Sequence, residues 1–138
     1  MKMKKYLFPL AFLCLAACQQ KASRPVAKPA PRATIVFLTE KSHDFGTYSE
    51  KDTVAFDFVF RNDGTVPYVI NRVEPSCGCV RVNYPKYPVA PGAVDSFHVV
   101  YDGNGFMPGF FVKRCDVYSN AEDSVFSLRI QGTFAEKK

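Results

Sequence analysis

The chain has 138 residues, with 18 Lys and Arg against 13 Asp and Glu, and its formal net charge at pH 7 is +5. The excess of positive charge is confined to the first 32 residues, because from residue 33 onward 11 basic residues face 13 acidic ones. A protein that binds nucleic acid needs a basic surface that neutralises phosphates. The composition therefore excludes nucleic acid as the expected partner.

The first 17 residues have the organisation of an export signal. A start with three lysines precedes an apolar run from Tyr6 to Leu15, and small residues then lead to Cys18. The sequence Leu15-Ala16-Ala17-Cys18 resembles the lipobox of bacterial lipoproteins, which implies cleavage before Cys18 and acylation of the new terminal residue. Two or more acyl chains hold a protein stably on membrane lipid. An ordinary secretory signal is the alternative, and it also exports the domain.

The segment after Cys18 is expected to be a spacer. Three prolines lie among Ala, Lys and Arg between Gln19 and Pro31, a composition too poor in apolar bulk to fold. We therefore expect a signal peptide at residues 1–17, a lipidated tether at 18–32 and one domain at 33–138. Because Gln19 is not the aspartate that retains many lipoproteins in the inner membrane, the expected location is the outer membrane, facing the periplasm.

The domain has the periodicity of strands, and no window of adequate length has helical periodicity. Between Thr53 and Phe60, for example, side chains on one face of the segment are apolar, as in a strand that covers a core. The expected strands, in chain order, are 35–38, the segment around Phe45, 53–60, 68–70, 80–83, 96–101, 111–117 and 126–131. About seven strands at this spacing predict an all-β fold, an immunoglobulin-like β-sandwich.

Two connections have distinct compositions. Residues 84–92 contain three prolines and end in Pro91-Gly92, which favours a turn, so this segment is expected to be an arch without regular pairing. Residues 103–109 contain three glycines and lie between two expected strands. They are expected to form a hairpin connection.

Short motifs in this order resemble the bacterial family called domain of unknown function 1573. They are Asp44-Phe45-Gly46-Thr47, Phe58 to Gly64, Ser76-Cys77-Gly78-Cys79, Tyr84-Pro85-Lys86, Pro91-Gly92 and Tyr118-Ser119-Asn120. The resemblance implies an exported and often lipid-anchored protein with a fold related to the immunoglobulin-like domains of the hydin and major sperm protein group. In this chain Val80 replaces the threonine that commonly follows the second cysteine, and Cys115 stands where an aliphatic residue is usual.

Three cysteines, Cys77, Cys79 and Cys115, belong to the expected domain, and in an oxidising compartment they cannot all pair with one another. The sequence leaves open a bond between Cys77 and Cys79 or a bond from either of them to Cys115. Thiolates also favour copper(I) or zinc, and a Cys-Gly-Cys pair is able to exchange with another disulfide. No further ligand lies at suitable spacing, so no metal and no cofactor are expected.

No enzymatic activity is expected. The chain has only His43 and His98, and neither lies in a recognisable active-site motif. The glycines of residues 103–109 are flanked by strands, so no helix N-terminus is available to receive a phosphate.

The leading functional hypothesis is a lipid-anchored module that binds an unknown protein of the cell envelope. Unpaired outer strands and aromatic loops would make the contacts. Tyr84, Tyr87, Phe106 and Met107 are the candidate contact residues, although they would equally fit a role in covering the open ends of the sandwich. The alternative hypothesis is a thiol site at Cys77 and Cys79 for metal binding or redox exchange.

Overall fold

A computed structural model describes residues 30–49, 53–104 and 106–135 of the chain. The expected signal peptide, the lipidation site Cys18 and most of the expected tether lie outside the described residues. The strands are β1 (Ile35–Phe37), β2 (Ser42–Ser49), β3 (Thr53–Asn62), β4 (Ile70–Pro75), β5 (Val80–Asn83), β6 (Val94–Asp102), β7 (Gly109–Ser119) and β8 (Val125–Ala135). In the part of the chain that the structure describes, no apolar helix is present that could span a membrane.

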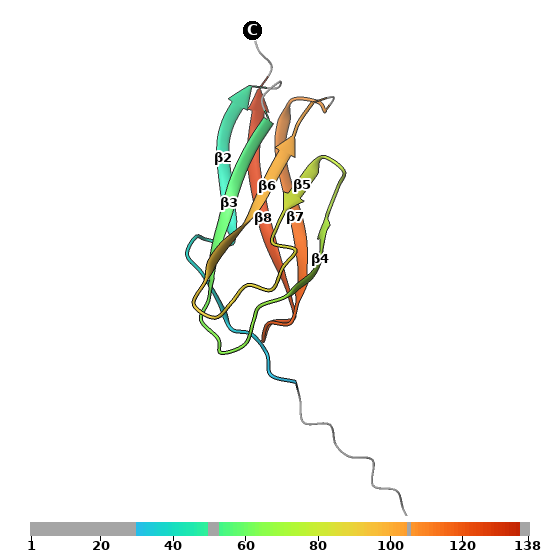
Figure 1. The fold of residues 1–138 in the computed structure, drawn as a ribbon. Helices are drawn as coiled ribbons and strands as arrows, with labels where there is room; N and C mark the ends of the chain where they lie inside the picture. The colour runs from blue at the N-terminus through green and yellow to red at the C-terminus, as the bar shows by residue number, and fades with distance from the viewer. Residues whose placement is uncertain (1–29, 50–52, 105, 136–138) are drawn as a thin grey trace, which may run out of the picture.

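The strands form two four-stranded sheets that pack face to face (Figure 1). One sheet has the order β1-β3-β6-β5 and the other has the order β2-β8-β7-β4. All pairs are antiparallel except β2 with β8, which is parallel. The predicted all-β sandwich is thereby confirmed.

The structure has eight strands, not about seven, because each of the short expected segments forms a strand, and the first two of these strands, β1 and β2, lie in different sheets. The N–H of Leu38 donates to the carbonyl of Val59 in the first sheet, at 2.8 Å. Only three residues later, the carbonyl of Lys41 accepts from the N–H of Arg129 in the second sheet, at 2.9 Å. The chain therefore crosses between the sheets at this point and supplies one edge strand to each, β1 and β2.

The core lies between the sheets and consists of the apolar sets that the alternation predicted. Residues 1% exposed or less include Phe58 and Phe60 on β3, Phe97 and Val99 on β6, Cys115 and Val117 on β7, and Leu128 and Ile130 on β8. Their partners across the sandwich are also apolar, so the sheets are held mainly by burial of aromatic and aliphatic surface.

The two connections differ in how well the sequence predicted them. The arch at 84–92 is confirmed: it ends in a turn in which the Ala93 N–H donates to the Ala90 carbonyl, and Gly92 has a φ of 78°. This φ favours glycine after Pro91. The segment 103–108 is not a hairpin, because β6 and β7 belong to different sheets. It crosses the end of the sandwich instead.

Candidate functional site

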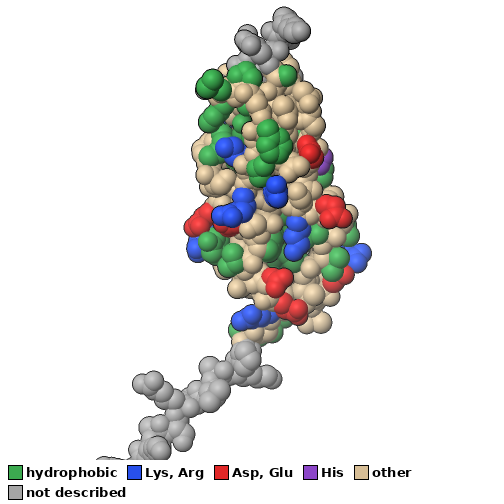
Figure 2. All heavy atoms as spheres, turned by 180° about the vertical axis from the view of Figure 1, so that it is seen from behind, with side chains coloured by type: hydrophobic (Ala, Val, Ile, Leu, Met, Phe, Trp, Pro, Cys, Tyr) green, Lys and Arg blue, Asp and Glu red, His purple; other side chains and the backbone are tan. Residues whose placement is uncertain are grey.

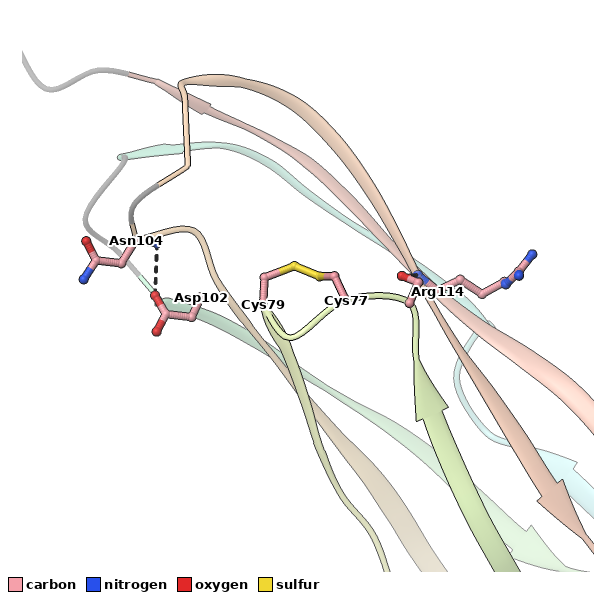
Figure 3. Close-up of a disulfide and its surroundings, with 6 residues drawn as sticks. Cys77, Cys79, Asp102, Asn104 and Arg114 are labelled. Atoms are coloured by element: carbon pink, nitrogen blue, oxygen red, sulfur yellow. Dashed lines mark hydrogen bonds between the residues drawn. A yellow bond between two sulfur atoms is a disulfide. The ribbon is translucent and has the colours of Figure 1, made fainter.

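The sequence Ser76-Cys77-Gly78-Cys79 connects β4 in one sheet to β5 in the other, at the end of the sandwich that also holds the β6–β7 connection (Figure 1). Cys77 and Cys79 form a disulfide with their Cα atoms 5.3 Å apart (Figure 3). Cys115 stays a free thiol in the core, 1% exposed. The structure therefore joins the two neighbouring cysteines and keeps the third apart.

Hydrogen bonds to neighbouring strands hold this disulfide loop on both sides. The Ser76 N–H donates to the Arg114 carbonyl at 2.8 Å, and the Arg114 N–H donates to Ser76 Oγ at 3.1 Å. On the other side the Asp102 N–H donates to the Cys79 carbonyl at 2.9 Å. Figure 3 shows the loop between Asp102 and Arg114. These contacts use no sulfur atom, so they fix the loop independently of the disulfide.

The disulfide is a weak cross-link for a fold. Its cysteines are separated by two positions, so it closes a loop that contains only Gly78 between them. In the chain-entropy account a loop this short adds roughly 1.5 kcal/mol, about half of the value for a 15-residue loop. Apart from Cys77 and Cys79, no residue has an atom within 4 Å of a Cβ atom built at Gly78. The loop is therefore open to solvent above the disulfide.

A groove of about 330 Å³ lies beside the loop. It is lined by Gly78, Cys79, Arg81, Asp102, Asn104 and Phe106. Arg81 reaches Asp102 at 3.8 Å, and both side chains keep more than a third of their surface exposed. This groove presents an aromatic ring, a cation and a carboxylate next to a disulfide.

Four large apolar side chains are exposed on the β6–β7 connection, whose Phe106 lines this groove, and on the adjoining end of β7. Phe106, Met107, Phe110 and Val112 are 46, 87, 66 and 41% exposed. We call them the distal apolar surface, because Figure 1 shows the β6–β7 connection at the end of the domain opposite to Ala30, where the described chain begins. Figure 2 looks onto the β2-β8-β7-β4 sheet, where hydrophobic side chains gather toward this end.

Basic side chains border the distal apolar surface (Figure 2). The Lys113 ammonium lies 6.0 Å from the centre of the Phe106 ring. Arg114 and Arg129 stand directly opposite one another on β7 and β8. Among the described residues, Arg114 has an ion pair with Asp116, whereas Arg129 donates to the neutral Gln131. Two like charges facing each other across strands destabilise a sheet.

Of the candidate contact residues, only Phe106 and Met107 lie at the distal end. Tyr84 and Tyr87 line a separate groove of about 370 Å³. The Tyr84 ring packs 6.4 Å from Phe97 and is covered by Lys86, whose Nζ is 3.2 Å from the ring centre. Tyr87 is 62% exposed. The structure therefore divides the four residues between two surfaces and does not bring them together.

Phe110 and Val112 were missed as candidate contacts, although the sequence held a signal. Successive side chains of a strand point to opposite faces, and Phe111 points into the core. Phe110 and Val112 must therefore point to solvent, where bulky apolar side chains have no role in the core. Arg129 was also missed. Nothing in the chain order predicts that it faces Arg114, because this depends on the register of β7 with β8.

Both histidines lie on strand faces. The His43 ring stacks on Phe56 with the ring centres 3.7 Å apart. His98 Nδ1 lies 2.7 Å from Asp57 Oδ1 at an exposed position. No group of three or more His, Cys, Asp or Glu side chains is placed to hold a metal ion within the described ranges.

Cys115 has the environment of an inert core residue. Burial, and to a lesser extent the charge of Asp116, raises the pKa of its thiol from 9.0 to about 11. A thiolate is the nucleophilic form, so this thiol is unreactive at neutral pH.

We expect Cys115 to make the fold sensitive to alkali. Its folded pKa lies above the unfolded value, so its contribution to stability is fully present below pH 9 and is lost as pH rises toward 11. The loss is about 2–3 kcal/mol. Urea unfolding at several pH values from 8 to 11 would measure it, with Cys115→Ala as the comparison. The variant should have a shallower decline, and an identical decline would contradict this assignment.

Comparison with solved structures shows the fold. A protein of unknown function from Porphyromonas gingivalis W83 superimposes with a TM-score of 0.64 at 13% identity, over 80% of this chain and 51% of that one. This chain therefore spans about half of the length of that protein. The ASH/PapD-like domain 7 of human CEP192 gives a TM-score of 0.59 at 14% identity, over 83% of this chain and 94% of that one. Both similarities support an immunoglobulin-like sandwich.

The sequence comparisons identify the family. A comparison with curated proteins gives no match. A family profile described as "Protein of unknown function (DUF1573)" matches residues 36–134, from within β1 to the last residue but one of β8. This range is well over half of the chain and contains every motif on which the resemblance was based. The chain therefore belongs to the DUF1573 family.

Proposed function

We propose that this chain is a lipid-anchored, non-enzymatic module of the bacterial cell envelope that binds a partner protein at the distal apolar surface. The observation that carries the proposal is the exposure of Phe106 and Met107 in the β6–β7 connection together with that of Phe110 and Val112 at the adjoining end of β7. Single exposed apolar residues are ordinary on protein surfaces, whereas a contiguous group of them is typical of interaction sites.

The partner is a protein segment with apolar side chains and neighbouring carboxylates. An acidic group next to the bound apolar side chains would lie over Arg114 and Arg129, and would remove the repulsion between them. Lys113 would add a third positive charge near Phe106. The charge at the border thus favours an acidic partner over a basic one.

The anchor and the binding surface are proposed to lie at opposite ends of the domain. The lipobox motif supports acylation at Cys18, and residues 18–32 would connect it to the domain. The described chain enters the sandwich at the end far from the disulfide loop (Figure 1). With its anchor in the outer membrane, the domain would then hold the distal apolar surface away from the lipid and toward the periplasm.

Site-specific photo-crosslinking in producing cells tests the proposal. A photoreactive side chain at Met107 is expected to capture a specific protein, and one at Val125 is not. Val125 is a matched control because it is 50% exposed and lies on the same sheet at the other end of β8. The captured segment should contain carboxylates close to the cross-linked residue.

Two further variants should reduce capture at Met107 by about tenfold or more, the effect expected of an interface hot spot. Phe110→Ala removes apolar contact area. Arg129→Glu removes the border charge and is expected to form an ion pair with Arg114, so a loss of capture would not come from unfolding. Equal capture at Met107 and Val125, or capture unchanged by both variants, would contradict the proposal.

A further inference from the structure

We propose that the Cys77–Cys79 disulfide is an exchange site that accepts two electrons from a pair of cysteine thiols on a partner protein. The proposal goes beyond binding, and it concerns the disulfide loop and the groove beside it rather than the distal apolar surface alone. It is stoichiometric: each molecule oxidises one dithiol and becomes a dithiol itself.

The loop exposes one cysteine more than the other. Cys77 is half-buried, whereas Cys79 is 7% exposed. No other residue covers the Cβ position of Gly78, which is exposed between them. An incoming thiolate therefore approaches over Gly78 and attacks Cys77 Sγ, because access decides which sulfur is attacked.

The domain is built to remain folded in both redox states. The hydrogen bonds that hold the loop to Arg114 and Asp102 come from backbone atoms and from Ser76 Oγ, not from the cysteine side chains. The core contains its own free cysteine and no cross-link between the sheets among the described residues. The disulfide encloses only one residue between its cysteines, so its reduction adds little chain entropy to the unfolded state and costs the fold little stability.

The exchange takes place in two balanced steps. The partner's first thiolate forms a bond to Cys77 Sγ, the Cys77–Cys79 bond breaks, and its electron pair goes to Cys79 Sγ, which then takes up a proton. The partner's second thiolate next attacks the partner's first sulfur, which is bonded to Cys77 in this mixed disulfide. Cys77 Sγ leaves with the electron pair and is protonated. The partner has then lost two electrons and gained a disulfide, and Cys77 and Cys79 are thiols.

The groove beside the loop supplies a place for the partner. Cys79 and Arg81 line the same groove, and a nearby cation favours the thiolate form of a leaving cysteine. Phe106 offers an apolar wall for the residues that flank the partner's thiol. Asp102 keeps Arg81 at the groove through their ion pair of 3.8 Å.

Glutathione tests the exchange without any docked partner, so its failure is distinguishable from failure of the proposed binding. The full-length protein is equilibrated in glutathione buffers of increasing reducing strength, alkylated, and measured by intact mass and circular dichroism. We expect Cys77 and Cys79 to become alkylatable at a glutathione ratio at which structural disulfides stay oxidised. The circular dichroism should not change.

Single-cysteine variants test which sulfur reacts. In Cys79→Ser the remaining Cys77 should form a mixed disulfide with oxidised glutathione about tenfold faster than Cys79 does in Cys77→Ser, because access limits the buried sulfur. Cys115→Ala should leave both results unchanged. A disulfide that resists the whole glutathione series, or one that is reduced only together with loss of the fold, would overturn the proposal. Equal rates for the two variants would overturn attack at Cys77.

Discussion

The substitution Asn62→Asp is expected to lower the free energy of unfolding by about 3–5 kcal/mol at neutral pH. Asn62 is completely buried at the end of β3. Its Nδ2 group donates to the carbonyls of Val66 and Val89, at 2.9 and 3.0 Å, and its Oδ1 accepts from the Gly64 N–H at 3.0 Å. A carboxylate would keep the last bond, lose the first two, and direct a buried negative charge at two carbonyl oxygens.

The effect of Asn62→Asp should depend on pH in a defined direction. Burial raises the folded pKa of the introduced carboxyl above its unfolded value of about 4. The variant is therefore most stable, relative to the parent, below pH 4 and loses stability as pH rises through the folded pKa. Urea unfolding followed by circular dichroism measures this, since the chain has no tryptophan.

Asn83→Asp is the matched control for this prediction, because Asn83 is exposed on β5. It should change the stability by less than about 0.5 kcal/mol. A loss below about 1 kcal/mol in Asn62→Asp would contradict the hydrogen-bonding role assigned to Asn62.

The strands were predictable because their alternation is a local property. Phe58 and Phe60 on β3, like Leu128 and Ile130 on β8, have the period of two that a half-buried strand requires. The pairing of strands was less predictable, since it depends on contacts between segments far apart in the sequence. For this reason the connection 103–108 was misread as a hairpin, and the sequence predicted neither the crossing at Leu38–Lys41 nor the burial of Asn62.

The candidate site was partly visible in the sequence. The Cys-Gly-Cys motif directed attention to the disulfide loop. Which cysteines are bonded, however, depends on the position of Cys115, whose side chain lies on the core-facing side of β7. Phe106 and Met107 stood out as apolar residues in a loop. The groove that joins Phe106 to Cys79 arises because β5 and β6 pair with Val80 opposite Tyr101. No local sequence pattern predicts the register of β5 with β6.

The second large effect is expected from Phe97→Ala, and Phe110→Ala is its matched control. Phe97 is fully buried, with the rings of Phe60 and Phe126 at 5.1 and 6.1 Å, so its removal leaves a cavity and should cost about 3–5 kcal/mol. Phe110 is 66% exposed, and its removal should change the stability by less than about 0.5 kcal/mol.

Urea unfolding of the two variants side by side compares one residue type in two environments. A loss above about 1 kcal/mol in Phe110→Ala would mean that this side chain stabilises the fold, and the distal apolar surface would lose its strongest support as a binding site. If instead Phe110→Ala keeps the parent stability and reduces crosslinking at Met107, then burial in the fold does not explain a phenylalanine at this position. Contact with a partner explains it, because an exposed aromatic side chain gains free energy only when another surface covers it.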